Sequence, residues 1–182
     1  MNYPVLIEKY TALPISLEKA LAWLRIPDSY MGDNDLVTDL IRSAADYIET
    51  ECNISLGIST YEWEADCLPG IIPDTFYLQG ISSISGLNSS GSTLVANTNY
   101  RVVKTGIRGR KIKWIDDYDH SYSGFSVIFT AGFESEDKIP PRLLMAMRAL
   151  IAEWYDNRGN LAQEKKTFVD NLLAPYVIAY SA

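Results

Sequence analysis

The residues best suited to chemistry form an acidic cluster around the single histidine of the chain. Its members are Asp116, Asp117, Asp119 and His120, whose carboxylate and imidazole groups are ligands for divalent cations. The spacing differs from that of a calcium-binding loop, because the central glycine and the terminal glutamate are missing. A hydrated loop between two strands explains the same residues equally well. A metal-dependent hydrolase built on this cluster is therefore an alternative that the sequence does not favour.

Other residues that could react have simpler structural explanations. Asp33 and Asp35 suit the N-cap and the first turn of a helix. The glycine-containing segment 106–109 does not lead from a strand into a helix, as a phosphate-binding loop must, and it indicates a turn. Cys52 and Cys67 lack a C-x-x-C spacing and a nearby histidine, which is typical of structural thiols. We therefore expect no catalytic residues, no cofactor and no metal, and the chain is predicted not to be an enzyme.

A stretch of basic residues in the middle of the chain contains no acidic residue. It comprises Arg101, Lys104, Arg108, Arg110, Lys111 and Lys113. On a strand, Lys111 and Lys113 share one face, with Ile112 and Trp114 on the other. Such a patch suits DNA phosphate or an acidic face of a neighbouring subunit, and a solvated hairpin face is an equally good explanation. Because the acidic cluster directly follows, head-to-tail pairing of identical subunits would use both patches.

Hydrophobic periodicity predicts two helices in the first third of the chain. Ser16 suits the N-cap of a short first helix, and Pro27 is expected to end it. A second helix is expected from about 34 to about 52, because an apolar stripe follows one side of this segment. Asp33 suits its N-cap, and Gly57 is a plausible stop.

The third predicted helix begins at Pro140 and Pro141, since proline is well tolerated in a first turn. Between 143 and 155 only Arg148 and Glu153 are charged, so the helix is apolar around most of its circumference. Such a helix must be covered on more than one side, which makes contact with another subunit a reasonable hypothesis. The tail that follows has a short helical pattern and is expected to dock on its own domain or on another chain.

Between these helices the pattern changes to a period of two. Tyr61, Trp63 and Ala65 would face one side of a strand, with polar residues on the other. Further strands are predicted near 75–79, 81–87, 93–95, 100–104, 110–115 and 125–131. Strands this close together predict an antiparallel, meander-like sheet. The fold class is therefore α+β: a mainly helical domain of three principal helices, with an antiparallel β portion inserted between helices 2 and 3.

Length and charge limit the possible functions. The 182 residues, 47% of them apolar, suit one domain over 1–182, with an N-terminal arm over about 1–14 and a C-terminal tail over about 160–182. No apolar run approaches the roughly 18–20 residues of a membrane span, so no membrane partner is expected. The 16 basic residues against 23 acidic ones give a net charge of −7, which repels DNA phosphate at long range.

Three motifs in a fixed order carry a resemblance to a known family. The first is Ile15–Arg25, followed by a polar loop, and the second is the acid-rich loop and long helix of Asp33–Glu49. The third runs from the strand and Thr-Ala-Gly-aromatic turn of Val127–Phe133, through the proline-initiated Ile139–Leu143, to the Trp-Tyr-x-x-Arg ending of Glu153–Arg158. In order and spacing this arrangement resembles the head–tail connector, or adaptor, proteins of tailed bacteriophages and prophages.

The resemblance implies a virion structural protein without catalysis. It implies a ring of about a dozen subunits under the portal protein in the virion neck. The chain would be made in the cytoplasm of the bacterial host, and its partners would be itself, the portal protein and a head-closure or tail-completion protein. Double-stranded DNA would pass through the lumen without specific binding. An acidic wall suits that role, because it does not hold a sliding polyanion.

A ring requires a heterologous interface, in which two different patches meet. The candidate interface residues are Arg108, Arg110, Lys111, Lys113, Asp116, Asp117, Asp119, Arg148, Trp154 and Tyr155. Two alternatives to the connector ring are kept: another neck or tail-completion protein of the virion, and the metal-dependent hydrolase described above.

Overall fold

The chain folds into two compact units, each assembled from two separate segments. The computed structural model describes residues 4–27, 30–65, 77–88, 91–95, 99–105, 109–115, 122–157 and 167–177. Met1–Tyr10 and Gly57–Gly132 make up one unit, which we call the strand unit. Thr11–Leu56 and Phe133–Ala182 make up the other, the helical unit. Whether the two units behave as the single predicted domain over 1–182 stays a prediction.

The helical unit begins with the two helices expected from the sequence. Helix α1 spans Leu17–Trp23, and the Ser16 hydroxyl caps it by accepting the backbone N–H of Lys19 at 3.3 Å. It ends before Pro27, because Arg25 turns the chain with a positive φ of 59°. Helix α2 spans Asn34–Cys52, as predicted.

The predicted ends of α2 need two corrections. Asp33 occupies the N-cap position, but its side chain makes no capping hydrogen bond. The helix stops at Asn53, which adopts the left-handed conformation with φ 53° and ψ 44°, and Gly57 is not the stop. Asparagine is among the few residues that adopt this conformation readily, so it can replace glycine at a helix C-terminus. Gly57 is instead covered by the Tyr10 ring, which leaves no room for a Cβ.

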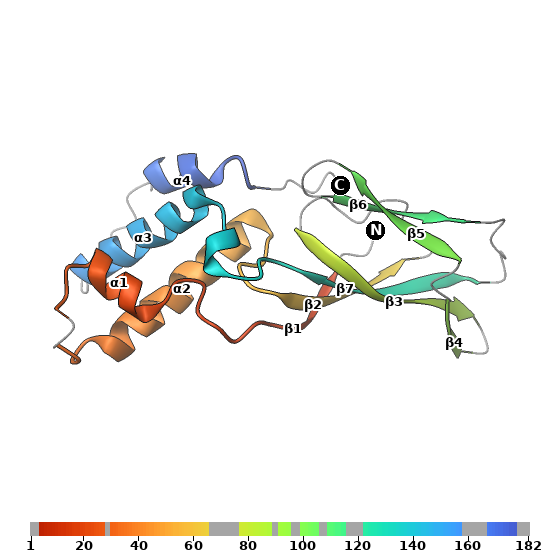
Figure 1. Cartoon of the computed structure of the whole chain (residues 1–182), viewed down its shortest axis with the longest axis horizontal. Helices are drawn as coiled ribbons and strands as arrows, with labels where there is room; N and C mark the ends of the chain where they lie inside the picture. Colours follow the sequence, from red (N-terminus) through yellow and green to blue (C-terminus); the bar gives the residue numbers. More distant parts are fainter. Residues whose placement is uncertain are drawn as a thin grey trace. The chain divides into compact units, whose positions relative to one another are not determined.

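The third predicted helix is covered by other helices of the same chain. Helix α3 spans Pro141–Asp156, and helix α4 in the tail spans Thr167–Leu173. Helix α3 contacts α1, α2 and α4 (Figure 1). Its buried side chains are Leu143, Ala146, Met147, Leu150 and Ile151. The apolar circumference that suggested a subunit contact is thus largely covered within the unit, and the described part of the tail docks on its own chain.

The strand unit contains a five-stranded antiparallel sheet. Its strands are β1 (Val5–Glu8), β2 (Ser59–Ala65), β3 (Leu78–Asn88), β4 (Gly91–Leu94) and β7 (Gly124–Ala131). Their spatial order is β1-β2-β7-β3-β4, so β7 lies between β2 and β3. The prediction of a meander is therefore wrong. The two strands predicted near 75–79 and 81–87 form one strand from Leu78, since Gly80 lies at a register shift without ending it; residues 75–76 lie outside the described chain.

A separate hairpin completes the strand unit. Strands β5 (Tyr100–Thr105) and β6 (Gly109–Trp114) pair with each other, as predicted. Thr105 is opposite Gly109, so Gly109 belongs to the strand, and the rest of the predicted turn, 106–108, lies outside the described chain. Tyr100 and Ile112 of this hairpin belong to the same buried cluster as residues of β2, β3 and β7. In that cluster, Tyr61 stacks on the fully buried Phe129, with ring centroids 5.5 Å apart.

The predicted fold class is confirmed. The protein is α+β, with its antiparallel strands lying mainly between α2 and α3. Residues 61, 63 and 65 do share a face of β2, and the two aromatic ones are buried. Among the described residues, no helix combines the length and the hydrophobicity needed to cross a membrane.

Candidate interaction surfaces

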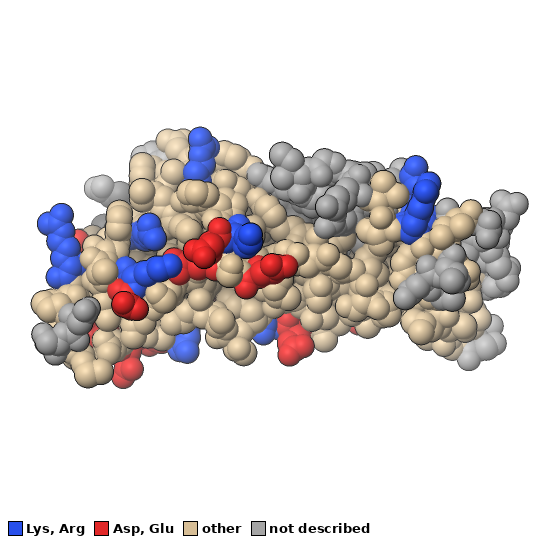
Figure 2. All heavy atoms as spheres, in the orientation of Figure 1, with Lys and Arg blue, Asp and Glu red and all other residues tan. Residues whose placement is uncertain are grey.

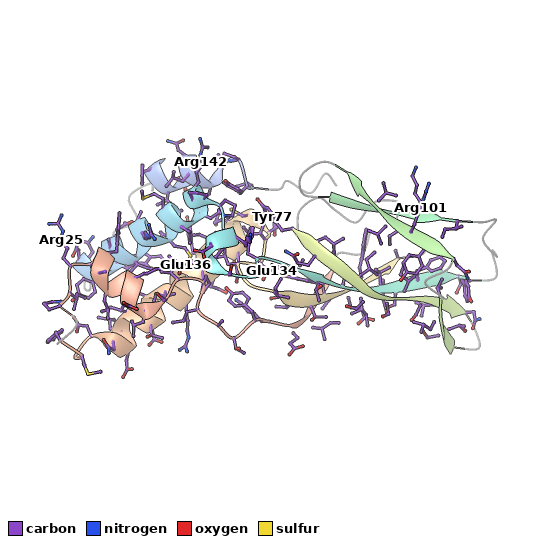
Figure 3. The ribbon with its side chains drawn as sticks, viewed as in Figure 1. Arg25, Tyr77, Arg101, Glu134, Glu136 and Arg142 are labelled. Carbon is purple, nitrogen blue, oxygen red and sulfur yellow. The ribbon has the colours of Figure 1, made fainter. Side chains whose placement is uncertain are left out.

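The β5–β6 hairpin brings two of the basic residues side by side. Arg101 on β5 is directly opposite Lys113 on β6, and both side chains are exposed. Figure 3 shows Arg101 on this hairpin. Like charges opposite each other on two strands repel, so this pair weakens the isolated hairpin and favours an anionic partner. Within the described chain, no acidic side chain is recorded in an ion pair with either residue.

The hairpin register divides the predicted basic stretch between two faces. Positions 101, 111 and 113 lie on one face of the hairpin, and positions 104 and 110 lie on the other with Ile112. The prediction that 111 and 113 share a face opposite Ile112 and Trp114 is therefore confirmed for the backbone positions. The other basic candidate, Arg108, lies outside the described residues. The register therefore does not place all the basic residues of the hairpin on one continuous face.

The acidic cluster lies outside the described residues. Asp116, Asp117, Asp119 and His120 all fall in the segment 116–121, so both the interface and the metal hypothesis for them stay predictions. In the part of the chain that the structure describes, no group of three or more His, Cys, Asp or Glu side chains is placed to hold a metal ion.

Arg148 contacts a neighbouring helix of its own unit. Its guanidinium lies 5.5 Å from the ring centroid of Trp23, which follows from the contact between α1 and α3. A cation over the face of an indole is stabilised by the ring quadrupole by about 0.5–1 kcal/mol at an exposed site. Because Trp23 keeps 44% of its surface exposed, the Arg148–Trp23 pair also presents a flat, cationic and aromatic surface to solvent.

The two aromatic candidates at the end of α3 also have partners within the helical unit. Trp154 packs edge-on against Tyr47 of α2, with ring centroids 6.3 Å apart. The Tyr155 hydroxyl donates a hydrogen bond to the carboxylate of Asp33, just before α2. Both residues are half-buried. Asp33 therefore joins the start of α2 to the end of α3 instead of capping its own helix.

Charges of both signs are mixed over the helical unit. Figure 2 shows acidic and basic side chains interspersed on the face of this unit that it displays. Lys19 of α1 forms an ion pair at 3.0 Å with Glu136, which lies in the short 3-10 helix η2 (Glu136–Lys138) and is labelled in Figure 3. Such a mixed surface provides no large electrostatic attraction for a nucleic acid phosphate backbone.

The described thiol is unreactive in the folded state. Cys52 is fully buried at the end of α2. Burial, with a smaller contribution from the charge of Glu51, raises the pKa of the Cys52 thiol to about 11. Since the thiolate is the nucleophile, this residue is a structural thiol, as the sequence suggested. Cys67 lies outside the described residues.

Sequence reasoning overlooked the two edges of the five-stranded sheet. The segment over about 1–14 was expected to be an N-terminal arm, and Val5–Glu8 within it form the edge strand β1. It was not identified as a surface, although Val5, Leu6 and Ile7 are all exposed. Leu94 on β4, at the opposite edge, is exposed as well. The available signal was a run of three apolar residues in a segment too short to bury itself.

Comparisons with known proteins agree with the motif order. Residues 14–78 match the family model of the phage gp6-like head-tail connector protein. This segment contains α1, α2 and β2, and it covers the first two motifs that carry the resemblance. The resemblance to head–tail connectors is therefore confirmed for this part of the chain. No curated protein matches.

Three solved structures share the fold over nearly the whole chain. A chain in the neck of an empty gene transfer agent (GTA) particle, computed with C6 symmetry, is 19% identical with a TM-score of 0.73, covering 99% of this chain and 97% of that chain. A chain in the virion of a native GTA particle is 18% identical with a TM-score of 0.74, covering 98% and 97%. A chain in the neck of the native particle, computed with C12 symmetry, is 20% identical with a TM-score of 0.65, covering 100% and 97%. At these identities the likeness establishes a common fold.

Proposed function

We propose that this protein is a non-enzymatic structural subunit of a head–tail connector ring in the neck of a phage-like particle. The observation that carries the proposal is the shared fold over nearly the full length of chains from GTA particles, two of them from necks. The match of residues 14–78 to the connector family model supports it independently.

The ring is the finer part of the proposal. The two neck structures were computed with C6 and C12 symmetry, which supports a homo-oligomer of this fold around an axis. In such a ring the portal protein would meet one face, and a head-closure or tail-completion protein would meet the other. Double-stranded DNA would pass through the lumen during packaging and ejection.

The charge of the chain suits a channel component. A net charge of −7 on each subunit sums to a strongly negative ring, which repels the phosphate backbone and lets the duplex slide. The interspersed charges of the helical unit agree with passage without specific binding (Figure 2). The structural thiol Cys52, with its raised pKa, offers no reactive centre for an enzyme.

The experiment that tests the proposal is electron microscopy of the purified protein mixed with the portal protein of the same particle, together with native mass spectrometry of the mixture. A ring of this chain on one end of the portal is expected. A protein that neither assembles nor binds the portal would contradict the proposal. A position lower in the neck, away from the portal, would favour a tail-completion protein instead.

A filter-binding assay with double-stranded DNA at about 50 mM salt separates a channel wall from a DNA-binding protein. We expect no retention, whereas a protein that holds DNA through phosphate contacts binds with a steep salt dependence. Retained stoichiometric metal that disappears in His120→Ala, with hydrolytic activity lost in parallel, would favour the hydrolase alternative.

A further inference from the structure

Among the described strands, none covers either outer edge of the five-stranded sheet. Strand β1 ends the spatial order on one side and β4 ends it on the other. Every side chain of β1 and of β4 is exposed, and within the described chain no strand pairs with the outer edge of either. An open edge presents unpaired N–H and C=O groups and is a template for another strand. A register shift between Leu6 and Glu8 limits the regular part of the β1 edge to its beginning.

The register places the most exposed apolar residues of the two edges on the same face of the sheet. Val5 is opposite Glu62 on β2, and the Glu62 carboxylate accepts a hydrogen bond of 2.7 Å from the Ser126 hydroxyl on β7. Ser126 is opposite Ser85 on β3, and Ser85 is opposite Leu94 on β4. The residue directly opposite Glu62 is Ile128, which lies two residues from Ser126 on β7 and therefore shares its face. Val5 and Leu94 thus lie on the same face of the sheet, in two neighbouring rows, and they are 66% and 69% exposed.

The opposite face of the sheet carries the core, and its cover stops at β1. Leu6 is opposite Tyr61, which is opposite Phe129, so the three form one apolar row across β1, β2 and β7. Phe129 is fully buried and Tyr61 nearly so, whereas 45% of Leu6 is exposed. A strand added beside β1 would extend the sheet and cover this residue.

We propose that β1 of one copy of this chain pairs with β4 of the next copy, with Val5 beside Leu94. This inference rests on the proposed ring, since it names the contact by which neighbouring subunits join. It uses two different edges of the same sheet, which is the heterologous arrangement that a closed ring requires. Each copy then uses its β1 edge to contact one neighbour and its β4 edge to contact the other.

Topology determines the direction of the new pair. All neighbours within the sheet are antiparallel, and four steps lead from β1 to β4, so these two strands run in the same direction. A rotation that keeps the same face outward and the same edge order also keeps the strand direction. The β1–β4 contact between copies is therefore parallel, with slanted hydrogen bonds. A β1–β1 contact would instead be antiparallel and would end at a dimer.

The charge of the two edges favours a second copy as the occupant. Copies with a net charge of −7 repel each other, so self-association favours contact where neither surface is charged. Val5, Leu6 and Ile7 are neutral, and so is every residue of Gly91–Leu94, whereas the one charged residue of β1, Glu8, lies beyond the register shift. Neither stretch contains the lysine or proline that natural proteins place on edges to prevent pairing.

The first test blocks one edge at a time in the full-length chain. Val5→Lys places a charge on the β1 edge, and Leu94→Lys places one on the β4 edge. Each variant alone is expected to lose at least tenfold in self-association, measured by sedimentation velocity and native mass spectrometry. An equimolar mixture of the two is expected to form one-to-one dimers and nothing larger, because it has one intact β4 edge and one intact β1 edge for every two chains.

The matched control is Phe168→Lys, which makes the same kind of change at an exposed apolar residue of α4. It is expected to self-associate as the unchanged protein does. If the rings persist in both edge variants, the edge pairing is overturned and the proposed connector function stands. If the edge variants lose binding to the portal protein but self-associate normally, the occupant is that partner and the proposal is again overturned.

The second test detects the contact even where assembly is weak. In a Cys67→Ser background, Val5→Cys combined with Leu94→Cys is expected to give a ladder of disulfide-linked oligomers under mild oxidation. Each single cysteine is expected to give no more than dimers, because a head-to-tail contact needs both. A double variant that stays monomeric or stops at dimers would overturn the pairing, whatever the portal experiment shows.

Discussion

The hydrogen bond from Tyr155 to Asp33 yields a sharp prediction about the end of α3. Tyr155 was selected from the sequence as an interface residue, yet its hydroxyl donates to a carboxylate of its own unit. Tyr155→Phe removes only the donor and keeps the ring in place. Asp33→Asn removes the charge and keeps the size of the acceptor. The combination of the two variants forms a double-mutant cycle that isolates the pair.

The expected magnitude follows from the partners and their exposure. Hydrogen bonds to charged groups contribute roughly 1.5–3 kcal/mol when well shielded. Both residues are half-buried, so water can replace the lost donor and the coupling should fall near about 1 kcal/mol. Asp33→Asn alone should cost more than the coupling, because the carboxylate at the N-terminus of α2 also interacts with the helix dipole, by about 0.3–1 kcal/mol.

Urea denaturation followed by circular dichroism at 222 nm is the suitable assay. All four described helices lie in the helical unit, so this signal reports its unfolding even if the strand unit unfolds separately. Separate transitions would have to be fitted independently, since the two-state treatment applies to each unit alone. A free energy of unfolding for each of the four proteins then gives the coupling.

Tyr30→Phe is the matched control, because Tyr30 is an exposed tyrosine of the same unit. Its loss of the hydroxyl should change the free energy of unfolding by less than about 0.5 kcal/mol. A coupling below about 0.3 kcal/mol between the Tyr155 and Asp33 substitutions would refute the reasoning. If Tyr155→Phe weakened assembly and left stability unchanged, the residue would act between subunits and not within one.

Three further changes test the packing and the backbone. The pKa of Cys52 in the folded state is about 11 against 9 for a free thiol, so the unfolded chain loses this proton first as pH rises. Stability is expected to fall between pH 9 and about 11, by at most about 2–3 kcal/mol, and Cys52→Ala should lessen that dependence in thermal melts. Gly132 has a φ of +114°, so Gly132→Ala should cost about 1–3 kcal/mol in denaturant unfolding. Phe129→Ala, in the centre of the strand unit, should cost about 3–5 kcal/mol and lower the midpoint of the near-ultraviolet melt.

The helices were predictable because their signals are local. The apolar stripe of α2 defines its buried face from Val37 to Cys52, and the same stripe can be read from the sequence. The stop was misassigned because a glycine is the usual helix terminator, while Asn53 adopts the left-handed conformation at almost the same cost. When two nearby residues can both end a helix, the hydrophobic pattern alone does not show which of them does.

The order of the strands was not predictable in the same way. Alternation identifies a strand and its two faces, as it did for Tyr61 and Trp63 on β2. It carries no information about the partner, and β2 pairs with β7, from the far end of the β portion. Pairing depends on which apolar faces can close a core together, and this is a property of the assembled unit.

The sequence identified residues suited to contacts, but it did not show whether their partners lie in another subunit or in the same chain. An arginine, a tryptophan and a tyrosine near the end of an apolar helix look the same whether they contact another subunit or another helix. Arg148, Trp154 and Tyr155 contact Trp23, Tyr47 and Asp33 respectively. Their role between subunits stays a prediction. Among the charged candidates, Lys113 is exposed and lies opposite Arg101, so it is available for contact with another molecule.

The exposed apolar surface that could join subunits lies on the edges of the five-stranded sheet and not on α3. The reasoning from sequence assigned the subunit contact to α3, on the ground that one domain could not cover so apolar a helix. Helices α1, α2 and α4 do cover it, and the large apolar side chains left exposed in the helical unit, such as Trp23, Met31 and Phe168, come from different segments, as on many monomers. In the strand unit, Val5, Leu6, Ile7 and Leu94 are exposed on the two sheet edges, where no described strand pairs with the outer backbone groups, whereas Ile58, Val102 and Ile115 are exposed elsewhere. Apolar surface and unpaired backbone together favour association more strongly than either alone, because one added strand satisfies both.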